Sequence, residues 1–173
     1  MRRMIARLLS VVLLAPVAAS AGSSEHPRGR MVDAVAAPGE IPIVTLHAEG
    51  AQLYECKADA DGKLAWAFRE PIAALIQDGH TVGRHYSGPT WEHIDGSAVT
   101  AKVVGSIPGL TANDISWLKL EVVTRRGDGV LSRATTVQRL RTVGGTLAGA
   151  CEKAGTWHAV PYSADYVFLR KGD

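Results

Sequence analysis

The chain has 173 residues, of which 46% are hydrophobic, and its 19 Lys and Arg residues nearly balance its 17 Asp and Glu residues. The nearest approach to a basic cluster is formed by the arginines at 125–126, 139 and 141. We interpret these residues as lying on solvated strand faces and in turns. Because a nucleic-acid partner needs a concentrated basic stripe, the composition excludes one, and the length fits a single domain with a sizeable core.

The first 21 residues have the pattern of a secretory signal peptide. Three arginines precede an apolar run over residues 8–18, and the small residues at 19–21 predict cleavage before Gly22. The apolar run is short for a membrane span, so we expect an exported protein, periplasmic or extracellular, with no stable membrane insertion after cleavage. Without this segment the chain has 16 basic and 17 acidic residues, because the segment contains three arginines and no acid.

Residues 22–39 are rich in Gly, Ser, Ala and Pro and are expected to form a flexible leader before a single β domain over 40–173. Within that domain apolar and polar residues alternate with a period of two, as in half-buried strands. The alternation predicts strands at 52–57, 63–70, 97–105, 115–123, 131–142 and 162–170.

Turn dipeptides separate these runs at spacings typical of sandwiches and barrels. Asp61-Gly62 and Asp128-Gly129 indicate hairpins, because glycine accepts the positive φ that such turns need. Together the patterns predict an all-β, mainly antiparallel fold, a single-domain β-sandwich or β-barrel with at most one short helix.

That helix is predicted over residues 71–79, with Pro71 in its first turn and Gly79 as its C-terminal cap. The segment is short, and a strand over 72–77 remains open.

Two cysteines, Cys56 and Cys151, follow the predicted signal peptide. In an exported chain a disulfide is expected, and closing a loop of nearly a hundred residues would stabilise the fold by about 4 to 5 kcal/mol on the chain-entropy model. The alternative, a redox pair or a metal site with two sulfurs, lacks the close C-x-x-C spacing.

Six segments carry a family resemblance: AQLYEC, LAWAF, GRHYSGPTWEHIDGS, ISWLKLEV, VQRLRTVGG and PYSADYVF. Their order and spacing over roughly residues 40 to 169 resemble those of domain-of-unknown-function family 3455. The resemblance implies a secreted, mostly β-sheet protein, and it implies no established activity.

Residues 83–97, GRHYSGPTWEHIDGS, are the best candidate for a functional site. We expect His85, Trp91 and Asp95 to line a binding site, with Glu92 and His93 as second choices. Zinc and copper favour imidazole ligands, so His85 and His93, on either side of Gly-Pro, are also candidate metal ligands.

Two other interpretations of this stretch remain. In a β-corner, His85 bonds a turn carbonyl, Trp91 fills the core and Asp95 closes a hairpin. In a hydrolase or metal-dependent enzyme, His85 acts with Asp95 and Ser97, although no G-x-S-x-G elbow is present.

The sequence thus favours an exported, non-enzymatic protein that binds a small ligand, a carbohydrate or a metal. The alternatives are a secreted hydrolase and a structural or interaction protein. The identity of the ligand and the oligomeric state are not encoded in any pattern of the sequence.

Overall fold

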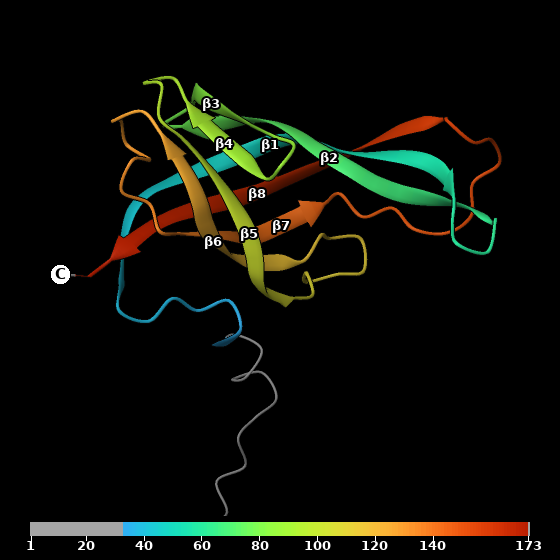
Figure 1. The fold of residues 1–173 in the computed structure, drawn as a ribbon, viewed down its shortest axis with the longest axis horizontal. Coiled ribbons are helices and arrows are strands. Elements are labelled where there is room, and N and C mark those ends of the chain that lie inside the picture. The colour runs from blue at the N-terminus through green and yellow to red at the C-terminus, as the bar shows by residue number, and fades with distance from the viewer. Residues whose placement is uncertain (1–32, 173) are drawn as a thin grey trace, which may run out of the picture.

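The computed structural model describes residues 33–172, in which eight antiparallel strands close into a barrel (Figure 1). Each strand pairs with the next along the chain, and the last pairs with the first. The strands are β1 (Glu40–Ala58), β2 (Leu64–Gln77), β3 (His80–Tyr86), β4 (Thr90–His93), β5 (Ala98–Ile107), β6 (Trp117–Arg126), β7 (Thr136–Gly144) and β8 (Trp157–Lys171). The predicted signal peptide and residues 22–32 of the predicted leader lie outside the described residues.

The period-two alternation builds the barrel wall, which confirms the all-β antiparallel prediction. In β1 the side chains of Leu46, Ala48, Gln52, Tyr54 and Cys56 are buried, and the residues between them are more exposed. Since successive side chains of a strand point to opposite faces, the buried set faces the interior of the sheet.

Residues 71–77 form the end of β2, so the predicted helix is wrong and the alternative strand is correct. On one edge of β2, Pro71 pairs with β1. On the other edge, pairing with β3 begins only at Ala73, so β2 can accommodate a proline at position 71. Asp78 and Gly79, with φ of 51° and 79°, make a two-residue hairpin turn into β3.

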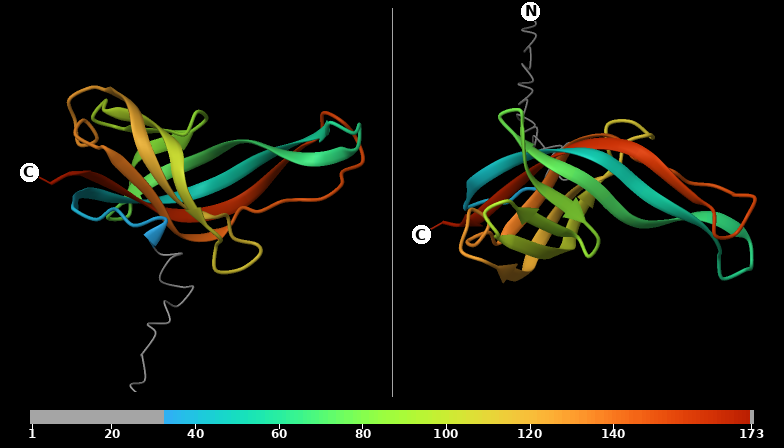
Figure 2. Two further views of the ribbon diagram at one scale, coloured as in Figure 1. Left: turned by 60° about the horizontal axis from the view of Figure 1, so that its bottom comes forward. Right: turned by 90° about the horizontal axis from the view of Figure 1, so that it is seen from above.

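Three strands continue beyond the barrel as an extension made of β1, β2 and β8 (Figure 2). The loop between β7 and β8 runs to the tip of this extension, where the Cys151 amide donates to the Leu64 carbonyl. The disulfide between Cys56 and Cys151, 95 residues apart, fixes the loop to β1. The predicted pairing of the cysteines is therefore confirmed.

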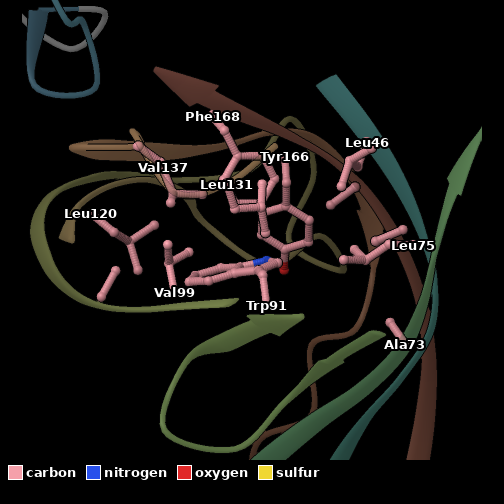
Figure 3. Close-up of a cluster of buried hydrophobic side chains, with 14 of the residues drawn as sticks. Leu46, Ala73, Leu75, Trp91, Val99, Leu120, Leu131, Val137, Tyr166 and Phe168 are labelled. Carbon is pink, nitrogen blue, oxygen red and sulfur yellow. The ribbon is translucent and has the colours of Figure 1, made fainter. Parts of the chain in front are cut away.

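The barrel interior is filled by one apolar cluster around Trp91 (Figure 3). The indole of Trp91 lies beside the ring of Tyr166, with ring centroids 5.2 Å apart, and edge-on to Phe168 at 6.0 Å. The aromatic rings come from β4 and β8, so the cluster ties the short β3–β4 hairpin to the long strands.

The barrel has two different ends. At the first, here called the closed end, the loop between β6 and β7 inserts Leu131, which is fully buried. At the second, here called the mouth, lie the turn between β3 and β4, the loop between β5 and β6, and the base of the extension.

Residues 33–39 lie against the barrel wall. Val35 is buried, and its carbonyl accepts a hydrogen bond of 2.6 Å from Nε2 of Gln138. Within residues 33–172 no helix is long and apolar enough to cross a membrane.

Candidate functional site

The β3–β4 hairpin places the two central residues of the predicted site side by side. His85 pairs with Trp91 across the hairpin, and their rings stack with centroids 4.5 Å apart and an interplanar angle of 8°. Gly88, with φ of 83°, allows the tight turn between the strands. Both side chains point into the barrel and are almost completely buried.

His85 is held in one neutral tautomer. Burial, together with the nearby positive charge of Arg139, lowers the pKa of His85 to about 4, although the hydrogen bond to Thr90 opposes this shift. Nδ1 lies 2.8 Å from the carbonyl oxygen of Thr90, and a carbonyl can only accept a hydrogen bond. Nδ1 therefore carries the proton, and Nε2 is left with a lone pair.

A cavity of about 580 Å³ opens at the mouth of the barrel, and we call it the mouth cavity. Its polar and aromatic lining residues with little exposure define what we call the inner part: the buried Gln52, His85, Trp91 and Tyr166 and the partly buried Arg139. These residues come from five strands, so the cavity depends on closure of the barrel. A volume of this size is typical of sites for small molecules.

The outer part of the mouth cavity is mainly apolar. It is lined among others by Phe68 from β2, Val103 from β5, Leu118 from β6, and the prolines Pro89 and Pro108 from the turns. Phe68 and Val103 are each 51% exposed, which is unusual for large apolar side chains on an inward-facing surface. The rim therefore offers an apolar surface to whatever enters the cavity.

Two buried N–H donors beside the mouth cavity have no hydrogen-bond partner. Nε1 of Trp91 is one, and Nε2 of Gln52 is the other. Burial raises the pKa of Tyr162, and the nearby Gln52 amide opposes this rise. The two groups nevertheless do not make a hydrogen bond of ordinary geometry. Buried donors are paired in the great majority of proteins, so two unpaired donors at one cavity call for an explanation.

Arg139 adds a positive charge to the inner cavity, and our interpretation of it as a solvated residue is wrong. It lies two residues after the buried Val137 on β7 and therefore shares its inward face. Its Nε donates to the carbonyl of Ser116 at 3.0 Å.

Asp95 and Ser97 lie at the closed end, away from the mouth cavity. The Asp95 carboxylate accepts hydrogen bonds from the Ser97 hydroxyl at 2.6 Å and from the Val130 amide at 2.7 Å. Burial raises the pKa of Asp95, but the hydrogen bonds from Ser97, Val130 and His93 outweigh burial and hold the pKa well below its usual range. The arrangement fixes the loop that carries Leu131, whose amide donates to the Ser97 hydroxyl at 3.1 Å.

This geometry does not bring together the three residues considered for a hydrolase. The Ser97 hydroxyl donates its hydrogen bond to Asp95, and His85 donates to the Thr90 carbonyl. A nucleophilic serine needs a base within hydrogen-bond reach of its hydroxyl, and His85 does not occupy that position.

Glu92 lies on the outer surface of the barrel. Its carboxylate accepts from the Tyr86 hydroxyl at 2.9 Å and forms ion pairs with Arg84 and Arg126 at 3.2 and 3.1 Å. The hydrogen bond from Tyr86, followed by that from Arg84, lowers the pKa of Glu92. This candidate therefore belongs to an exterior ion-pair network.

His93 lies beside the turn at the closed end, with Nδ1 3.1 Å from Asp95 Oδ2. The structure thus gives His85 and His93 different partners. Among residues 33–172 no group of three or more His, Cys, Asp and Glu side chains is placed to hold a metal ion.

The sequence prediction found His85 and Trp91 of the inner cavity and missed Gln52, Arg139 and Tyr166 as site residues. Strand alternation is the signal that indicates two of these residues, because Gln52 shares a face with Tyr54, and Arg139 shares one with Val137. A polar residue at an inward position of a barrel strand marks a cavity more directly than a cluster of polar residues in a turn.

No curated protein and no solved structure matched this chain. One family model matched residues 37–170, which include all eight strands except Lys171, the last residue of β8. The resemblance inferred from the six sequence segments is thus confirmed. The chain belongs to the family described as "Protein of unknown function (DUF3455)".

Proposed function

We propose that this protein is exported and that it binds a small, largely apolar molecule in the mouth cavity without converting it chemically. The cavity has the volume of a small-molecule site, an apolar rim and a few polar groups at its base. This combination holds the body of a ligand by burial and its orientation by hydrogen bonds.

The observation that carries the proposal is the pair of unpaired donors, Trp91 Nε1 and Gln52 Nε2. Leaving a buried donor without an acceptor costs about 1 to 3 kcal/mol. A ligand with an acceptor atom would recover that free energy on binding, whereas a purely structural barrel gains nothing from the two groups.

Export is supported by the signal pattern at residues 1–21 and by the disulfide between Cys56 and Cys151. Disulfides form and persist in oxidising compartments such as the periplasm and the extracellular space. A ligand met there is a free small molecule, and we propose no nucleic-acid partner.

A binding assay with a neutral fluorescent probe tests the proposal. N-phenyl-1-naphthylamine fluoresces more strongly in apolar surroundings, so the signal-free protein is expected to enhance its emission saturably. Val103→Trp places a large side chain on the lining of the mouth cavity and is expected to weaken probe binding at least about tenfold.

Val123→Trp is the matched control, because Val103 and Val123 are both 51% exposed and Val123 lies outside the mouth cavity. The control is expected to bind the probe like the unmodified protein. Equal binding by both variants would contradict the cavity as the site. No saturable binding in any protein would favour a structural or interaction role.

A further inference from the structure

The charge at the base of the mouth cavity restricts the ligand further. Arg139 is the inward-facing cation of β7, and within residues 33–172 no carboxylate forms an ion pair with it. Its Nε donates to the Ser116 carbonyl at 3.0 Å. Burial raises the pKa of Tyr166, and the guanidinium lies close enough to the Tyr166 hydroxyl to oppose this rise. A guanidinium has five N–H donors, so most of its capacity is unused.

The contrast with Arg141, two residues further along the chain, is informative. A register shift between Leu140 and Val143, with Arg141 at φ 49°, interrupts the alternation and turns this side chain to the outer face. Arg141 is exposed on the outside of the barrel and is paired with Asp165, to which its Nε donates at 2.6 Å. A surface cation with ample water has a carboxylate partner, whereas the cation in the cavity has none. Charges withdrawn from water are normally paired, but within residues 33–172 the partly buried Arg139 lacks a carboxylate partner.

Other charged groups at the cavity do not supply it. Asp114 lines the cavity, but its carboxylate accepts from the Gly144 amide at 2.7 Å and from the Thr111 hydroxyl at 2.7 Å. Arg69 also lines the cavity and is already paired with Glu55 at 3.4 Å. Of the two arginines in the cavity lining, Arg139 is therefore the one without a carboxylate partner within residues 33–172.

The unpaired hydrogen-bonding groups point to the same chemistry. Trp91 Nε1 and Gln52 Nε2 are both donors, and they belong to residues that line the same cavity as Arg139. Three donor groups from β1, β4 and β7 suit a group that is rich in acceptors. A carboxylate has two oxygens that accept several hydrogen bonds and matches the guanidinium fork.

We propose that the mouth cavity binds an amphiphilic monoanion whose carboxylate-like head group lies innermost, against Arg139, with its apolar body along Phe68, Val103 and Leu118. This inference rests on the proposed function and names the ligand class for the same cavity. The head group enters first because the donors line the inner part and the apolar residues line the rim.

Displacement of N-phenyl-1-naphthylamine by decanoate, decanol and decyltrimethylammonium tests the charge requirement. In the unmodified protein decanoate is expected to bind at least about tenfold more tightly than decanol, as a hydrogen-bonded charge pair predicts. Decyltrimethylammonium is expected to be the weakest competitor. Equal affinities for decanoate and decanol would overturn the anionic head group and leave the proposed function standing.

Variants at β7 assign the preference to one residue. Arg139→Gln is expected to remove the preference for decanoate and leave decanol unchanged, whereas Arg139→Lys keeps part of it because the charge remains. Arg141→Gln is the control on the outer surface and is expected to keep the full preference. If Arg139→Gln keeps the preference, the head group lies elsewhere and the inference is overturned.

Folding of each variant is checked by circular dichroism and thermal unfolding before titration. If the fluorescent probe does not bind, decanoate is titrated directly by calorimetry into the unmodified protein. Heat that saturates and is lost in Arg139→Gln but not in Arg141→Gln supports the inference, and the absence of any binding overturns both proposals.

Discussion

At the closed end, both oxygens of the Asp95 carboxylate accept hydrogen bonds, and the Ser97 hydroxyl both donates and accepts. At the mouth, Gln52 and Trp91 are about as buried as Ser97, but each leaves an N–H group without a partner. The two ends belong to one barrel and share strands, so the difference does not arise from general packing. Polar groups stabilise the fold at the closed end, whereas the unpaired groups at the mouth are the basis of the proposed ligand site.

The first test of this comparison truncates Leu131, the side chain that the loop between β6 and β7 inserts at the closed end. Leu131 is fully buried, and Leu131→Ala is expected to lower the free energy of unfolding by about 3 to 4 kcal/mol through lost burial and a remaining void. Urea denaturation measures the loss, and probe binding measured on the folded variant should be unchanged. A variant that folds with weakened binding would show that the two ends are coupled.

A second test uses pH, because burial lowers the pKa of His85 to about 4 from 6.5. As the pH falls through 6.5, His85 takes up a proton in the unfolded chain but not in the folded protein. The protein therefore keeps its full stability above pH 6.5 and loses stability progressively as the pH falls toward 4. At pH 5 the loss is about 2 kcal/mol, since one pKa unit corresponds to about 1.4 kcal/mol.

His85→Phe keeps a flat ring beside Trp91 and removes the titrating group, so the variant should lose less stability than the unmodified protein between pH 7 and pH 5. Denaturation at both pH values measures this difference. Asp95 at the closed end does not interfere, because its lowered pKa makes its contribution disappear only below about pH 4. Identical pH dependence in both proteins would mean that His85 remains hydrated at the base of the cavity.

The smallest effects compare one buried polar residue from each end. Ser97→Ala breaks two side-chain hydrogen bonds at the closed end and is expected to cost about 1 to 2 kcal/mol. Gln52→Leu removes an unpaired donor from a buried site and should change stability by less than about 0.5 kcal/mol, or increase it. A large cost for Gln52→Leu, measured by thermal unfolding, would mean that its amide contributes to the fold.

Much of the fold could be predicted from the sequence, because strand alternation, turn glycines and the two cysteines each have a local physical cause. The segment at 71–79 was misread since a proline followed by small and apolar residues also fits the first turn of a helix. Its strand state depends on pairing with β1, which is distant in sequence. Asp78-Gly79 was the local signal for a hairpin.

The candidate site was only half predictable, and strand geometry explains why. Residues 83–97 are close in sequence, but a strand advances about 3.3 Å per residue and therefore crosses the small barrel within a few residues. His85 and Trp91 lie at the base of the mouth cavity, whereas Asp95 lies at the closed end. Strand alternation places Arg139 on the inward face of β7, but the residues from other strands that it meets there are set by barrel closure, for which a stretch of local sequence contains no signal.

Pairing of the first and last strands determines where a fusion partner or a surface linker can be joined to the protein. Glu40 pairs with Lys171, and the Gly172 amide donates to the Gly39 carbonyl at 3.1 Å, so both ends of the barrel chain lie together, far from the mouth. A fusion partner or surface linker joined at either position would leave the cavity facing outward. The barrel can thus be immobilised through either of these positions in one defined orientation.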